Sequence, residues 1–134
     1  MSRKGNLFVY GTLRSGLANP FATKLQNSER LLGRARLKGR LYLIADYPGC
    51  VPSEHEGEWV HGEVYELKTP DATYQMLDDY EGCGAHDRGP HEFRRVILPV
   101  QLDSGRWIDA SVYIFTQDVS TKQRIETGDF LIQH

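Results

Sequence analysis

The sequence contains few cysteines, no long apolar run and no excess of positive charge. Its 134 residues include two cysteines, Cys50 and Cys83, which form no CxxC pair and have no histidines at zinc spacing. No segment approaches the roughly 18 consecutive apolar residues that a membrane span needs. The polar start of the chain lacks the apolar core of a signal peptide. We therefore expect a cytoplasmic protein with reduced thiols, without a metal and without a membrane anchor, and the sequence leaves open a disulfide between Cys50 and Cys83.

The charge balance is typical of a globular protein and does not favour binding to nucleic acid. The formal net charge is -2, so no basic field would attract nucleic acid or an anionic membrane. Hydrophobic residues make up 40% and charged residues 25% of the chain. Basic residues at 34, 36, 38 and 40 alternate with apolar or small residues, which favours the solvent side of a strand. We expect one domain over residues 1–134.

Short apolar runs predict about six strands. The clearest signal is a hairpin in which residues 96–102 and 108–114 alternate apolar side chains on either side of a turn at 103–106. Residues 46–53 contain two prolines and are predicted to form an ordered loop. The other predicted strands cover Leu7–Tyr10, Leu31–Leu37, Arg40–Ile44 and Val60–Leu67.

Two segments carry helix signals. Thr69 can cap a helix, Pro70 suits its first position and Gly82 is a natural stop, so residues 69–82 are predicted to be helical. Residues 20–25 predict a second, short helix. The fold class that follows is α+β: a small mixed β-barrel of about six strands with one or two short flanking helices. A barrel of this size can hold one small ligand.

Glu81 is a candidate functional carboxylate. If the helix faces the core through Tyr74 and Leu77, Glu81 is the next position on the same stripe. Burial and the negative end of the helix dipole would both raise the pKa of its carboxyl group, which suits an acid that accepts and donates protons. The alternative is a frayed last turn with Glu81 in water, and the periodicity alone leaves both open.

The segment Val9–Arg14 is a second candidate. A strand that ends in Gly11-Thr12 presents successive backbone N–H groups, which can bind a carboxylate or phosphate, and the glycine admits a ligand close to the backbone. A plain turn gives the same pattern. The segment is not a P-loop, because the GK[ST] ending is missing.

Taken together, these segments resemble the γ-glutamylcyclotransferase-like family, the AIG-like barrel proteins. The resemblance covers nearly the whole chain, and its most specific parts are Phe8–Arg14 and Leu77–Gly82. The remaining matching segments are Tyr47–Gly49, Val60–Tyr65 and Ala110–Tyr113.

The resemblance implies an enzyme that cyclises a small γ-glutamyl amide or γ-glutamyl amine to pyroglutamate (5-oxoproline) and releases the amine, with no cofactor. By the family pattern Glu81 is the general base and acid. The substrate would be bound by the backbone of Tyr10, Gly11, Thr12 and Leu13, and Tyr113 would line the cavity.

Other interpretations stay open at this stage. The barrel could bind a γ-glutamyl metabolite or another small carboxylate without turnover. It could also be a related lyase that acts on another substrate, such as a γ-glutamyl cross-linked amine rather than a free dipeptide. Asp78 lies three residues before Glu81 and could reach it, whereas a thiol nucleophile at Cys83 lacks a placed histidine partner. The sequence selects neither the leaving amine nor the oligomeric state. A metal site is disfavoured because the spacing of its candidate ligands matches no standard motif: His86, Asp87, His91 and Glu92.

Overall fold

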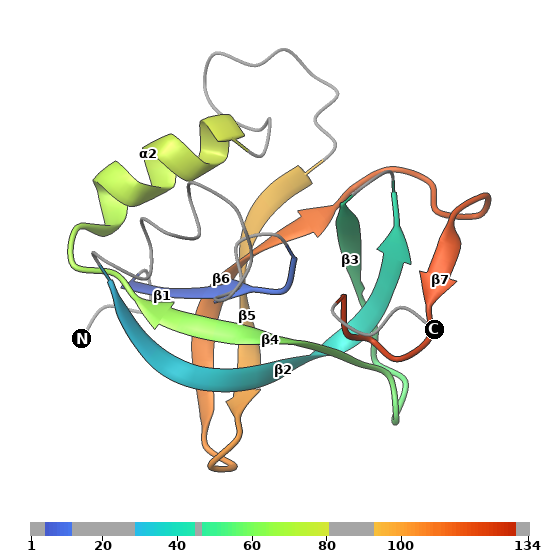
Figure 1. Cartoon of the computed structure of the whole chain (residues 1–134), viewed down its shortest axis with the longest axis horizontal. Helices are drawn as coiled ribbons and strands as arrows, with labels where there is room; N and C mark the ends of the chain where they lie inside the picture. Colours follow the sequence, from blue (N-terminus) through green and yellow to red (C-terminus); the bar gives the residue numbers. More distant parts are fainter. Residues whose placement is uncertain (1–4, 12–28, 45–46, 81–92, 131–134) are drawn as a thin grey trace.

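A computed structural model describes residues 5–11, 29–44, 47–80 and 93–130 of the chain, with only the backbone described for residues 79 and 80. Seven strands and one helix lie within these residues (Figure 1). Their bounds are β1 Asn6–Val9, β2 Arg30–Leu43, β3 Pro48–Pro52, β4 Trp59–Glu66, α2 Pro70–Tyr80, β5 Phe93–Leu102, β6 Trp107–Phe115 and β7 Gln123–Ile125.

The strands form a closed barrel with a two-strand extension. The pairing runs β2-β4-β1-β6-β5, and β5 pairs again with β2 through Ala35↔Leu102 and Arg36↔Gln101. Strands β3 and β7 both pair with the C-terminal part of β2. The sheet is mixed, because β1 and β6 are parallel whereas the other pairs are antiparallel. This arrangement confirms the predicted mixed barrel.

Strand β2 is one continuous 14-residue strand, so the prediction of two separate segments was wrong. Gly39 allows the continuity, because an added Cβ there would lie 2.9 Å from the Val51 carbonyl oxygen. At the other end of β2, a register shift between Leu31 and Gly33 marks an irregularity in the pairing with β4. Gly33 has φ of 139°, a conformation that favours glycine, at this point.

The predicted proline-bearing loop was also wrong in part, because Pro48–Pro52 is strand β3. Its two prolines occupy the first and last positions, opposite Leu43 and Gly39 of β2. Strand β3 is an edge strand, where a residue without an N–H is tolerated. The composition of the segment indicates a loop, but its pairing with β2 makes it a strand.

The helix begins and packs as its sequence pattern predicts. Thr73 N–H donates to the Thr69 carbonyl oxygen at 3.1 Å, which is the first helical bond, and Pro70 occupies the first helical position. Tyr74 and Leu77 are 4% and 0% exposed, so this stripe faces the sheet as expected. Helix α2 lies over one side of the barrel (Figure 1).

Two hydrophobic clusters follow from the alternation along the strands. One fills the barrel with side chains from all five barrel strands, including Phe8, Leu37, Val64, Val100 and Val112. The other lies between the sheet and α2, and holds alternate residues of four of these strands, β1, β4, β5 and β6, including Leu7, Val9, Tyr65, Tyr113 and Phe115. The face between barrel and helix is therefore built largely from aromatic side chains.

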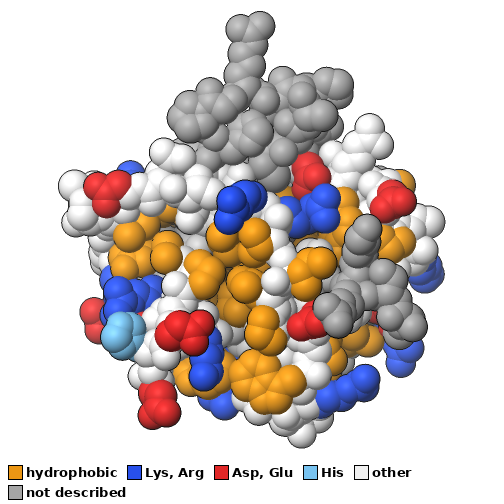
Figure 2. Space-filling view, turned by 180° about the vertical axis from the view of Figure 1, so that it is seen from behind, with side chains coloured by type: hydrophobic (Ala, Val, Ile, Leu, Met, Phe, Trp, Pro, Cys, Tyr) orange, Lys and Arg blue, Asp and Glu red, His pale blue; other side chains and the backbone are white. Residues whose placement is uncertain are grey.

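The surface carries interspersed charges of both signs. Figure 2 shows hydrophobic side chains gathered near the middle of one face, with basic and acidic side chains around them. Along β2, Arg34 and Lys38 are exposed while Ala35 and Leu37 are buried, which confirms the solvent-facing basic side of this strand. No described helix is long and apolar enough to cross a membrane.

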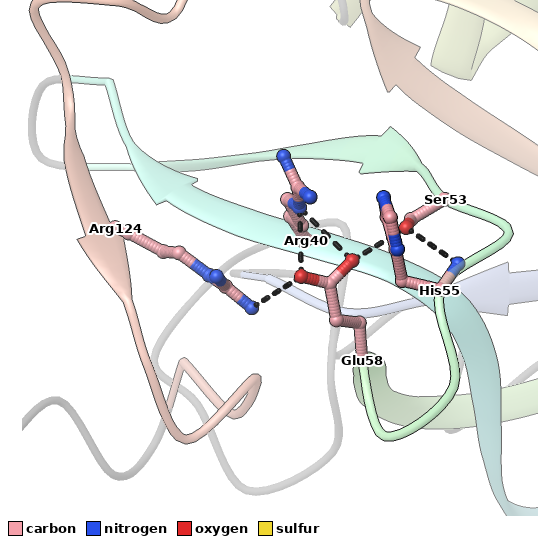
Figure 3. Close-up of polar contacts among 5 residues, drawn as sticks. All are labelled: Arg40, Ser53, His55, Glu58 and Arg124. Atoms are coloured by element: carbon pink, nitrogen blue, oxygen red, sulfur yellow. Dashed lines mark hydrogen bonds and ion pairs between the residues drawn. The ribbon is translucent and has the colours of Figure 1, made fainter.

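Glu58 joins three segments at the extended end of the barrel (Figure 3). Arg40 Nε of β2 lies 2.9 Å from both of its carboxylate oxygens, and Arg124 Nη2 of β7 lies 3.3 Å from Oε2. Ser53 Oγ, just after β3, donates to Oε1 at 2.5 Å. The Ser53 hydrogen bond and Arg40 lower the pKa of Glu58 to about 2.

We expect Glu58→Gln to lower stability at neutral pH and to matter less in acid. A depressed folded-state pKa contributes stability that is present above the unfolded value, near 4.5, and is lost as the pH falls through about 2. The difference in urea midpoint between wild type and Glu58→Gln should therefore be largest at pH 7 and about half as large by pH 3. Glu56→Gln, at an exposed position in the same loop, is the control and should show little difference at either pH. A difference in urea midpoint that stays constant with pH would show that the charge of Glu58 does not contribute through Arg40 and Arg124.

Candidate functional site

The end of β1 is held by the side chain of Tyr10. Its hydroxyl donates to the Tyr113 carbonyl oxygen of β6 at 2.5 Å and accepts from the Cys50 N–H of β3 at 3.2 Å. Tyr10 is 6% exposed, so both bonds are shielded from water. The point at which the chain leaves β1 is thus fixed to two other strands.

Gly11 follows Tyr10 and lies close to Pro48. An added Cβ on Gly11 would be 2.9 Å from Pro48 Cγ, which is too near for an ordinary side chain. Gly49 is similarly enclosed, since an added Cβ there would lie 2.9 Å from atoms of Ile44 and Phe115. The structure therefore brings together the Tyr10-Gly11 and Tyr47-Pro48-Gly49 segments, and both glycines are required for the close approach.

Tyr113 connects the end of β1 to helix α2. Its backbone carbonyl accepts from the Tyr10 hydroxyl, and its own hydroxyl donates to Asp78 Oδ1 at 2.6 Å. Asp78 lies in the last turn of α2. Tyr113 is 4% exposed and packs in the cluster beneath the helix. One residue of β6 therefore contacts both of the sequence segments that are most specific in the chain.

Asp78 also pairs with a cation from β5. Arg95 Nε donates to Oδ1 at 2.9 Å and Nη2 donates to Oδ2 at 3.2 Å. The Arg95 guanidinium lies 4.1 Å from the centre of the Tyr74 ring. The negative charge of the Asp78 carboxylate is therefore paired with the positive charge of Arg95.

The thiol of Cys50 offers no nucleophile. It is free, fully buried and shielded from solvent, and this burial raises its pKa to about 12. A nucleophilic cysteine needs a thiolate at cellular pH. Cys83 lies outside the described residues.

Three of the six predicted site residues lie in the described part of the chain. Tyr10, Gly11 and Tyr113 are brought together as given above, whereas Thr12, Leu13 and Glu81 lie outside it. The loop of metal candidates at 86–92 also lies outside. Among the described residues, no three His, Cys, Asp or Glu side chains are grouped so as to hold a metal ion.

The sequence matches the model of the family described as "Gamma-glutamyl cyclotransferase, AIG2-like" over residues 7–131. The chain belongs to this family. A Vibrio cholerae protein provisionally named a γ-glutamylcyclotransferase is 35% identical, over 92% of this chain and 93% of its own. The γ-glutamylaminecyclotransferase of Bos taurus is 32% identical, over 78% of this chain and 61% of its own.

Solved structures share the fold. A crystal structure of an AIG2-like protein from Mus musculus has a TM-score of 0.68 and 25% identity, over 87% of this chain and 80% of its own. YkqA from Bacillus subtilis also has a TM-score of 0.68, with 26% identity over 94% of this chain, which spans 39% of that protein's chain. The predicted family and fold are confirmed, and so is the prediction of an enzyme, since the family and its named relatives are cyclotransferases.

Sequence reasoning missed Arg95 as a member of the site. The hairpin register could have indicated it. The apolar alternation puts the even-numbered residues of 96–102 and 108–114 on one face, which leaves Arg95 and Tyr113 together on the other, and the structure makes them direct partners. Cross-strand partners share a face of the sheet, so a charged residue opposite a candidate tyrosine was a usable signal.

We expect Tyr10→Phe to destabilise the fold by about 1–3 kcal/mol, because it leaves a buried carbonyl and a buried N–H without this partner. Urea unfolding followed by the fluorescence of Trp59 and Trp107 measures the loss. Tyr65→Phe is the matched control, because the buried Tyr65 hydroxyl has no hydrogen-bond partner among the described residues. Equal costs for the two changes would show that the Tyr10 bridge is unimportant.

Proposed function

We propose that this enzyme cyclises a γ-glutamyl amide or γ-glutamyl amine to pyroglutamate and releases the amine, with Glu81 as general base and acid. The substrate is a small molecule, and the site requires no metal or organic cofactor. We also propose that the enzyme works in the cytoplasm, without nucleic acid or membrane. The free thiol of Cys50 and the net charge of -2 support this setting.

The reaction needs proton transfer and correct geometry more than an enzyme nucleophile. The α-amine of the γ-glutamyl group attacks its own γ-carbonyl carbon, which forms the ring C–N bond. Glu81 accepts a proton from this nitrogen, and then donates a proton to the leaving nitrogen as the amide C–N bond breaks. The products are pyroglutamate and the free amine. Because attacking and leaving groups belong to one molecule, holding the substrate folded supplies much of the rate.

The substrate would be held where β1 ends. Backbone N–H groups of Tyr10, Gly11, Thr12 and Leu13 suit the α-carboxylate of the substrate or the neighbouring oxygens. Tyr113 would line the same cavity. The close packing of Gly11 against Pro48 supports this assignment, since it fixes the position of the backbone directly after Tyr10.

The observation that carries the proposal is the double role of Tyr113. Its carbonyl binds the residue before Gly11, and its hydroxyl binds the last turn of the helix that ends at Tyr80, one position before Glu81 in the sequence. The structure thus joins the strand end and the helix end that the family pattern assigns to binding and catalysis. The name of the bovine relative supports γ-glutamyl amines as one substrate class.

We expect Glu81→Gln to lower turnover by about a hundredfold or more, the usual scale of acid–base contributions. Amine release and pyroglutamate would be measured with γ-glutamyl-alanine, ε-(γ-glutamyl)-lysine and glutathione as probes. Far-UV circular dichroism and the urea midpoint should match wild type, because the change is isosteric. Cys83→Ser is the control and should keep full activity. Normal turnover by Glu81→Gln would remove Glu81 from the mechanism.

Acetylation of the substrate α-amine should abolish cleavage. The acetyl group removes the nucleophilic lone pair and leaves the scissile amide intact, so a cyclising enzyme has no attacking atom. Competition against unmodified substrate shows whether the acetylated compound still binds. A hydrolase that uses water would still cleave it, and would release free glutamate from the unmodified substrate at the rate of amine release. Either result would contradict cyclisation.

A further inference from the structure

The pairing of Asp78 with Arg95 joins helix α2 to the barrel. Asp78 lies at the end of the helix where a negative charge is unfavourable. Asp78 lies in the last turn of α2, where the partial negative charge of the helix end opposes a carboxylate. No basic residue occurs in that turn. The compensating charge therefore comes from another element, strand β5, through Arg95.

The geometry of the pair is well defined. Arg95 donates two hydrogen bonds, one to each carboxylate oxygen, in the planar arrangement that arginine favours. Tyr113 of β6 donates a third, at 2.6 Å. Arg95 and Tyr113 are direct cross-strand partners, so their side chains leave the same face of the sheet together.

Tyr74 restricts Arg95 from a further side. Its ring lies 4.1 Å from the guanidinium carbon, and its hydroxyl donates to the Asn6 carbonyl oxygen of β1 at 3.3 Å. Tyr74 precedes Asp78 by four residues and so lies on the same helix face. The guanidinium is thus held between a ring and a carboxylate of one helix, and cannot rotate without losing both.

Stability alone does not explain this arrangement. The side chains of Asp78 and Arg95 are 21% and 32% exposed, and a single ion pair at this exposure makes only a modest contribution to stability. The barrel has a comparable two-oxygen pair in Arg40 and Glu58, with exposures of 37% and 16%, and this pair does not involve α2. What distinguishes the Asp78–Arg95 pair is its location, three residues before Glu81.

We propose that Asp78 and Arg95 are positioning residues for the cyclisation: their bridge fixes the last turn of α2 against β5 and β6, and thereby sets the place of Glu81. This inference rests on the proposed function, because it acts through Glu81. Neither residue exchanges a proton with the substrate. A small displacement of a catalytic group is enough to cost a large factor in rate.

The test compares three variants on γ-glutamyl-alanine and ε-(γ-glutamyl)-lysine. Asp78→Asn removes the charge and keeps the shape, and Arg95→Lys keeps the charge but loses the two-bond geometry. Both should lower kcat by between about tenfold and a hundredfold, with KM changed less than about threefold. Glu58→Gln is the control: it disrupts the other ion pair, and should lower the urea midpoint while leaving kcat within about twofold.

The second arm places each change in a Glu81→Gln background. If the bridge acts through Glu81, Asp78→Asn should lower the residual rate of Glu81→Gln by less than about twofold. Unchanged kcat in folded Asp78→Asn or Arg95→Lys, together with an inactive Glu81→Gln, would overturn the bridge and leave the proposed function standing. A fully active Glu81→Gln would overturn both. If Asp78→Asn does not fold, Arg95→Lys and its combination with Glu81→Gln decide the matter.

Discussion

The architecture depends on the hydrogen-bonding edges of one strand, β2. It pairs with β4 along one part of its length, with β3 and β7 at its C-terminal end, and with β5 at the barrel seam. The seam consists of two residue pairs, and Arg36 strengthens it: its Nε and Nη2 both donate to Gln101 Oε1, at 3.0 and 2.8 Å. The same guanidinium lies 3.8 Å from the Trp59 ring of β4. One long strand therefore closes the barrel by pairing with β5 and also pairs with the two strands of the extension, β3 and β7.

The interface between the sheet and α2 combines an aromatic core with hydrogen-bonded polar side chains. Its aromatic side chains give it the character of a core, yet it also holds a carboxylate, a guanidinium and tyrosine hydroxyls with defined partners. Such polar groups are costly inside a protein unless they are paired. The hydrogen bonds of Asp78 with Arg95 and Tyr113 each join two different elements, so these polar groups fix the relative positions of β5, β6 and α2. Apolar contacts alone would define those positions with less precision, because they are not directional.

Sequence patterns predicted the local elements well and the distant pairings poorly. The β5–β6 hairpin and helix α2 could be predicted because their turn, caps and alternation lie within a short stretch of chain. The two errors, at β2 and β3, involve residues whose strand character comes from a partner: Gly39 fits against Val51, and Pro48 pairs opposite Leu43. The contact of Arg95 with Asp78 depends on the β5–β6 register as well as on composition. For the candidate site, the family resemblance proposed Tyr10, Gly11 and Tyr113, whereas the hydrogen bonds of Tyr10 to Tyr113 and Cys50 depend on long-range packing that the sequence does not show.

The bond between Tyr10 and Tyr113 also bears on the order of folding. The two residues lie 103 positions apart in the chain, and β1 needs β6 as its parallel neighbour. Contacts between residues so far apart in the chain stabilise the fold only after the entropic cost of closing the intervening loop has been met. The hairpin and α2 can form early from local contacts, whereas the strand that leads to Gly11 gains its place late. The end of β1 that precedes Gly11 therefore gains its place only once β6 has formed.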